Sequence, residues 1–108
     1  MTAGQGGTLA PENLTVTAFA PHLNQVFRAD NGPGGAVELE LIEAKALPVR
    51  PGAPREPFSL IFRGPSGVPL EQTIYRLSHD ELGELDLFLV PLGSEGDPEG
   101  LHYQSLFN

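Results

Sequence analysis

Short segments in which apolar and polar residues alternate recur along the chain, and they limit its fold more than any other feature. In residues 36–44, AVELELIEA, every second residue from Val37 to Leu41 is apolar, and glutamates stand between them. Successive side chains of a β-strand point to opposite faces, so this segment predicts a strand with one apolar and one solvated face. Strands are also predicted over residues 25–29, 58–64, 70–78, 84–92 and 101–108.

The segments between these predicted strands are rich in glycine and proline. The chain has 13 glycines and 11 prolines, which favour turns and interrupt helices. Residues 30–35, DNGPGG, predict a turn, and residues 47–57, with four prolines, predict a long surface connection. Residues 64–69, GPSGVP, are expected to turn the chain back into the next strand. Parallel strands need long crossovers and no helical crossover is predicted, so the strands are expected to pair antiparallel.

We therefore predict an all-β fold, a small six-stranded antiparallel barrel with one short N-terminal helix. Closing the sheet removes the exposed edges that an open sheet of this size would leave. A two-sheet sandwich is the alternative architecture. The length of 108 residues suits one domain. We place this domain at residues 14–108, after a flexible leader at 1–13.

The only helical stretch is predicted at residues 15–23, TVTAFAPHL. Thr15 is a suitable N-cap, and Pro21 would end the helix after one or two turns. Asn24 follows, and asparagine tolerates the left-handed backbone conformation that a sharp change of direction requires.

Composition and charge exclude several classes of function. The chain has no cysteine, which removes disulfides, thiolate metal sites and cysteine nucleophiles. Its formal charge is −8, and seven acidic residues but no lysine or arginine follow Arg76. Proteins that bind nucleic acids or anionic membranes use basic residues to contact phosphates, so neither partner is expected. The acidic excess has two interpretations, solubility or an acidic face for a basic partner.

No targeting or membrane segment is predicted. The N-terminus has neither a basic start nor an apolar run, so it does not resemble a secretory signal. The longest apolar run is residues 87–92, which is far shorter than a membrane-spanning helix. We expect a cytoplasmic protein.

The sequence Ser78-His79-Asp80 has the residue types of a catalytic triad, but its context favours a corner between two strands. Neighbouring residues on an extended chain point to opposite faces, so Ser78 and His79 would diverge. The polar residues that follow and the glycine at Gly83 are typical of a tight connection. We predict a structural corner and no catalytic residues.

A metal site is the competing interpretation of this corner. Its ligands would be His79, Asp80 and Glu81, helped by His22 or His102. Adjacent residues on a turn seldom point to one centre, and the three histidines match no known ligand spacing. No metal and no cofactor are predicted.

A pocket at one end of the barrel would make the protein a small-ligand binder or an enzyme. The candidate residues are Arg63, Gln72, Tyr75, Arg76 and His79. An arginine among so many acids could hold an anionic ligand. The alternative is that both arginines pair with carboxylates across strands, at Glu38, Glu40 or Glu71, for about 0.2–1 kcal/mol each.

Two of the predicted strands, residues 58–64 and 84–92, are apolar on both faces. A small barrel has one dry interior, so some of these side chains must face outward. The candidates for an interface are Ile61, Phe88 and Val90. Either the helix or the proline-rich connection covers them, or they form an apolar patch for a protein partner or for self-association.

Several segments together resemble a bacterial family of small domains of unknown function, about as long as this chain. They are AFAPHLNQVFRA, VELEL, PFSLIFRGP, LEQTIYRL, HDELGELDLFLVPLG and YQSLFN, and the resemblance spans residues 15–108. Members often carry glycine where this chain has Asn24. The resemblance implies a compact β domain and brings no catalytic residues. It also implies that genes of this family sometimes neighbour phage-tail-like or tail-collar genes. We therefore expect a non-enzymatic protein-binding or assembly module, with a ligand binder or enzyme as the alternative.

Overall fold

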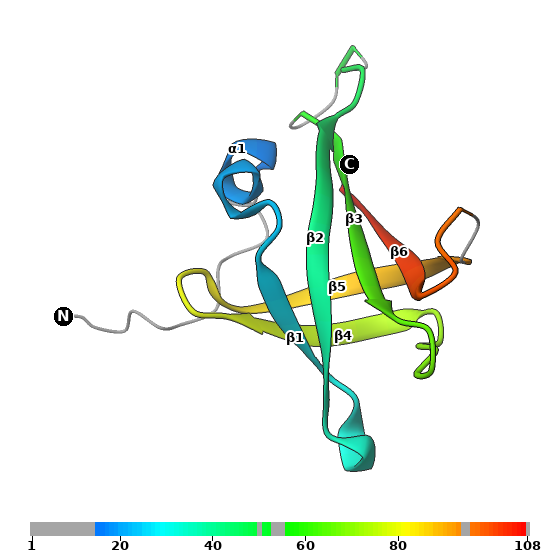
Figure 1. Ribbon diagram of the computed structural model, residues 1–108. Helices are drawn as coiled ribbons and strands as arrows, with labels where there is room; N and C mark the ends of the chain where they lie inside the picture. Colours follow the sequence, from blue (N-terminus) through cyan, green and yellow to red (C-terminus); the bar gives the residue numbers. More distant parts are fainter. Residues whose placement is uncertain (1–14, 50, 53–55, 94–95, 108) are drawn as a thin grey trace, which may run out of the picture.

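A computed structural model describes residues 15–49, 51–52, 56–93 and 96–107. Within these residues the chain forms six strands preceded by one short helix, as the alternation of residues predicts (Figure 1). The predicted leader at 1–13 lies outside the described residues. The elements are α1 (Val16–Phe19), the 3₁₀ turn η2 (Ala20–His22), β1 (Val26–Asp30), the 3₁₀ turn η3 (Gly32–Gly34), β2 (Ala36–Ala46), β3 (Phe58–Pro65), β4 (Thr73–His79), β5 (Gly83–Gly93) and β6 (Gly100–Phe107).

The strands close into an antiparallel barrel in the order β1-β2-β3-β6-β5-β4. In Figure 1, β4 and β5 run across the direction of β2 and β3. Pairing between β4 and β1 closes the barrel over a short stretch. Arg28 lies opposite Ser78 there, and Ala29 lies opposite Leu77. The predicted barrel is confirmed, and the sandwich alternative is not adopted.

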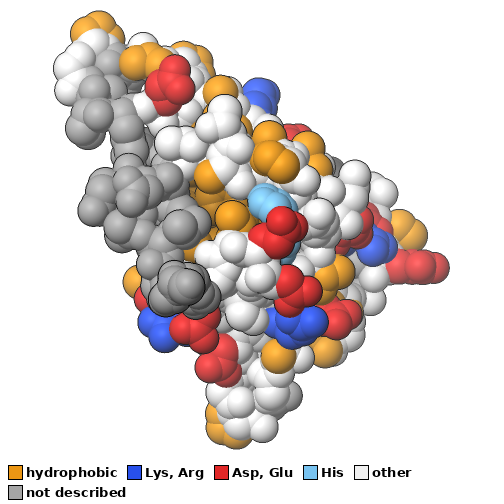
Figure 2. Space-filling view, turned by 90° about the vertical axis from the view of Figure 1, so that its left-hand side faces the viewer, with side chains coloured by type: hydrophobic (Ala, Val, Ile, Leu, Met, Phe, Trp, Pro, Cys, Tyr) orange, Lys and Arg blue, Asp and Glu red, His pale blue; other side chains and the backbone are white. Residues whose placement is uncertain are grey.

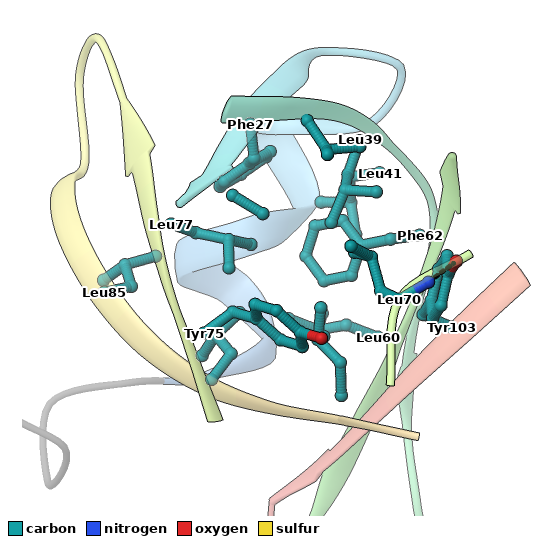
Figure 3. Packing of buried hydrophobic residues seen from close by; sticks show 14 of the residues in the cluster. Phe27, Leu39, Leu41, Leu60, Phe62, Leu70, Tyr75, Leu77, Leu85 and Tyr103 are labelled. Atoms are coloured by element: carbon teal, nitrogen blue, oxygen red, sulfur yellow. Dashed lines mark hydrogen bonds between the residues drawn. The ribbon is translucent and has the colours of Figure 1, made fainter. Parts of the chain in front are cut away.

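The expected turn from β3 directly back into a paired β4 is wrong. β3 pairs with β2 and β6, whereas β4 lies between β5 and β1. The link between β3 and β4 therefore crosses from one part of the barrel to another. It brings Leu70 into the core, where the Leu70 N–H donates to Tyr103 Oη at 2.9 Å (Figure 3). Turn residues indicate that a chain changes direction, but they do not specify which strand it will pair with.

The barrel interior is filled by the apolar residues of the alternating pattern (Figure 3). On β5 the three leucines at 85, 87 and 89 are fully buried, and the residues between them face outward. The same alternation places the inner face of β2 in the core. The buried core consists of Phe19, Phe27, Ala29, Val37, Leu39, Leu41, Phe58, Leu60, Phe62, Leu70, Tyr75, Leu77, Leu85, Leu87, Leu89 and Tyr103.

The short helix packs against the barrel mainly through Phe19, and Val16 and Ala18 are partly buried against the core. The predicted cap is confirmed, since Thr15 Oγ1 accepts a hydrogen bond from the Ala18 N–H at 3.3 Å. Phe19 is fully buried, and its ring centroid lies 6.5 Å from Phe27, 6.0 Å from Phe58 and 6.1 Å from Phe107. These rings come from β1, β3 and β6, so Phe19 joins the helix to three strands.

The chain changes direction between η2 and β1 at Asn24. Its φ of 68° is in the left-handed region, as predicted. Within the described residues, no helix has the length and apolar character needed to cross a membrane.

Candidate functional site

His79 is the last residue of β4 and is buried at the corner that leads into β5. Its Nδ1 lies 3.0 Å from the Glu81 backbone nitrogen and 3.1 Å from that of Leu82, and both N–H groups donate to it. A ring nitrogen that accepts a hydrogen bond carries no proton, so the ring proton is on Nε2. Nε2 donates it to Gln25 Oε1 at 2.8 Å.

The ring of His79 packs between two other rings. Its centroid lies 4.6 Å from that of Phe27 and 4.6 Å from that of His22. Gln25 Oε1 also lies 2.9 Å from His22 Nδ1, so one amide oxygen joins both histidines. Burial lowers the pKa of His79, and the nearby His22 lowers it further. The carboxylates of Glu81 and Asp80 act in the opposite direction.

This arrangement leaves His79 no free lone pair for a metal ion or for accepting a substrate proton. Asp80 points outward, and its Oδ1 lies 3.8 Å from Arg28 Nη1. His79 lies opposite Gly83, whose φ of 79° suits glycine at the turn. The predicted interpretation as a structural corner therefore agrees with the geometry.

Arg63 is held by Asp97, which comes from the loop between β5 and β6. Arg63 Nε donates to Asp97 Oδ2 at 2.5 Å, and Nη2 donates to Oδ1 at 3.1 Å. His102 Nε2 lies 2.9 Å from the same Oδ2. These bonds, first from Arg63 and then from His102, hold the pKa of Asp97 well below its usual range. Glu40 lies opposite Arg63 in the sheet, but the expected ion pair with Glu38 or Glu40 is replaced by this bidentate contact.

Arg76 is also engaged, on the outer face of β4. Its Nε donates to Asp86 Oδ1 at 2.9 Å, its Nη2 donates to Oδ2 at 3.2 Å, and Nη1 lies 3.6 Å from Glu84. Arg76 therefore pairs with carboxylates across strands, as expected, but with Asp86 and Glu84 of β5 and not with Glu38, Glu40 or Glu71. The contact between Arg63 and Asp97 also needs a glycine at position 100. A Cβ there would lie 2.6 Å from Arg63 Nε and 2.7 Å from Asp97 Oδ2.

The structure does not bring the five predicted ligand-binding residues together. Gln72 precedes β4 and His79 ends it, about seven residues or 23 Å apart along an extended strand. Tyr75 is buried, with its Oη donating to the Glu71 carbonyl at 2.8 Å, whereas Arg76 points outward. Arg63 lies on β3. Ligand binding by these residues stays a prediction without a shared site.

An apolar surface lies on the outer face of the barrel. Ile74 of β4 is directly opposite Phe88 of β5, and their side chains are 64% and 46% exposed. Ile61 of β3 and Val90 of β5 are both opposite Gln104 of β6, so these two predicted interface residues share one row. Leu106, also exposed, is two residues farther along the same face of β6. We call Ile61, Ile74, Phe88, Val90 and Leu106 the outer apolar face.

Three members of this face, Ile61, Phe88 and Val90, are predicted from the sequence. The other two, Ile74 and Leu106, are not. The signal for Ile74 was present, because alternation in residues 70–78 puts it on the face opposite Tyr75 and Leu77. Its position beside Phe88 depends on the β4–β5 register, which the alternation does not give.

Residues 14–107 match the model of a domain of unknown function, DUF6916. The chain belongs to this family. The match covers all of the described elements and confirms the resemblance seen in the sequence. No curated protein and no solved structure matches the chain.

Proposed function

We propose that this DUF6916 domain is a non-enzymatic protein-binding module whose docking surface is the outer apolar face. The observation that carries the proposal is the pair Ile74 and Phe88, two large apolar side chains in direct cross-strand contact positions and both substantially exposed. Interfaces between proteins are centred on such residues, and aromatic side chains are enriched at the positions that contribute most.

The charge of the chain indicates what kind of partner would fit. Two copies, each with a formal charge of −8, would repel one another during association. A different protein with basic residues around an apolar centre would instead be attracted. On β5, Glu84 and Asp86 lie on the same outward face as Phe88 and are four and two residues from it. Arg76 of β4 pairs with both carboxylates, so this edge of the apolar surface keeps one net negative charge.

The polar candidate residues already have hydrogen-bond partners within the protein, and this supports a binding role over a catalytic one. Arg63 and Arg76 each hold a carboxylate by two hydrogen bonds, and both ring nitrogens of His79 have partners. The proposal therefore includes neither an enzymatic activity nor a small anionic ligand. The family resemblance supports one setting for such a module, as a cytoplasmic accessory of a phage-tail-like assembly.

Replacing both Ile74 and Phe88 by serine is expected to weaken partner binding by about tenfold or more, because it removes the apolar centre of the interface. The partner is first captured from cells that express the chain and identified by mass spectrometry. The purified partner is then titrated against wild-type and variant protein by calorimetry. Binding of the wild type should also weaken with salt.

Val26→Ser is the matched control. Val26 is 44% exposed, a fraction similar to the 46% of Phe88. It lies on β1, outside the outer apolar face. It should leave partner affinity unchanged. Equal affinity of the wild type and the double variant for the purified partner would overturn the proposal. So would light scattering that shows self-association through Ile74 and Phe88, since the occupant would then be a second copy.

A further inference from the structure

We propose that His79 is a proton-operated latch, which holds the β4–β5 corner and the η2 turn against the barrel and releases them on acidification. This inference is independent of the proposed function. It concerns the side of the molecule where α1 and the β4–β5 corner lie. On that side, Figure 2 shows a histidine reaching the surface beside acidic side chains.

The latch depends on the two hydrogen bonds at one ring nitrogen. His79 Nδ1 accepts from the N–H groups of Glu81 and Leu82, and its other nitrogen already carries the ring proton. The next proton can therefore bind only at Nδ1. It would turn the acceptor into a donor that faces two other donors, and both bonds would be lost. The protonated Nδ1 would then face two N–H groups at 3.0 and 3.1 Å, and the repulsion between these donors would open the corner.

The groups around His79 set the direction of this response. His22 of η2 faces it, and a positive charge there opposes a second one on His79. Glu81 and Asp80 of the corner favour the charged ring, but their side chains are 70% and 90% exposed. Asp80 is also near Arg28 of β1, which adds a positive charge on the same side. Water screens such exposed carboxylates, so burial decides the outcome.

The corner is connected to the helix by Gln25. Its side-chain oxygen contacts His79 and also His22, the last residue of η2. Phe19, which packs on three strands, ends the helix just before η2. On the other side of the corner, Leu82 packs partly against the core. Opening would therefore loosen both the corner and the contact that anchors η2.

The sign of the pH dependence follows from the lowered pKa of His79. The unfolded or opened chain has an ordinary histidine pKa of about 6.5, so it binds a proton more readily than the closed corner. The closed state is fully favoured above about pH 6.5 and loses stability as the pH falls below that value. The loss continues until the pH reaches the lowered pKa of the closed state.

Amide hydrogen exchange at Glu81 and Leu82 tests the latch directly. In the wild-type protein, the equilibrium constant for local opening should rise as the pH falls below about 6.5, by at most about tenfold per pH unit, until the pH reaches the lowered pKa of His79, after correction for the intrinsic exchange rate. In His79→Asn the side-chain oxygen can still accept from the backbone but does not titrate, so the rise should disappear. His102→Gln is the matched control, since His102 contacts Asp97 instead, and it should keep the wild-type profile.

Nitrogen chemical shifts of the His79 ring provide a second readout that needs no variant. They should report the tautomer protonated at Nε2, with a midpoint below pH 6.5. A midpoint at or above 6.5 would overturn the proposal. Unchanged opening at Glu81 and Leu82 from pH 7 to 5 would do the same, as would an identical rise in His79→Asn.

Discussion

Phe19→Ala is expected to lower the free energy of unfolding by about 3–5 kcal/mol, the usual cost of removing a fully buried phenylalanine. Phe19 is completely buried, and its ring contacts aromatic side chains from β1, β3 and β6. The helix that carries it has a single hydrogen-bonded turn, so it cannot be stable by itself. Its attachment to the barrel therefore depends mainly on this side chain, with smaller contacts from Val16 and Ala18.

Chemical denaturation monitored by circular dichroism measures the effect. Phe88→Ala is the matched control, because it removes the same atoms from a side chain that is 46% exposed on the outer face. The control should cost less than half as much as Phe19→Ala. Equal losses for the two variants would mean that α1 does not close against the barrel in solution.

Leu70→Ala is expected to cost about 2–5 kcal/mol, although Leu70 lies in a connection between strands. Residues in such connections are usually exposed and tolerate substitution. Leu70 is instead buried in the core, and its N–H donates to Tyr103 Oη inside the molecule. The large cost follows from the path of the β3–β4 link, which brings this residue into the barrel.

The same denaturation measurement checks this prediction, with Val68→Ala as the control on the same link. Val68 is 40% exposed, so its truncation should change stability by no more than about 0.5 kcal/mol. If Leu70→Ala were as mild as Val68→Ala, the link would be an ordinary surface turn and not part of the core.

The position of each strand could be predicted from the sequence because alternation reports directly on which side chains are buried. Leu85, Leu87 and Leu89 are predicted on one face and fill the core. Pairing between strands is not local information. The expected β3–β4 hairpin was wrong because a turn rich in glycine and proline is compatible with both a hairpin and a crossing link.

In the candidate site, too, only contacts between residues close in the sequence could be predicted. His79 could be placed at a corner from local residue types, because the residues that bond to its Nδ1 are two and three positions away. Its contact with Gln25 joins distant parts of the chain, as does the pairing of Arg63 with Asp97. These partners depend on how strands far apart in the sequence lie in the barrel, which the sequence pattern does not specify.

The closed strand order is the central claim, because the outer apolar face and the latch both depend on it. Nuclear Overhauser effects between backbone protons of isotopically labelled protein test it most directly. The account predicts cross-strand contacts between Arg28 and Ser78 and between Ala29 and Leu77, with none between β3 and β4. Contacts that pair residues 58–65 with residues 73–79, or the absence of any contact between β1 and β4, would contradict it.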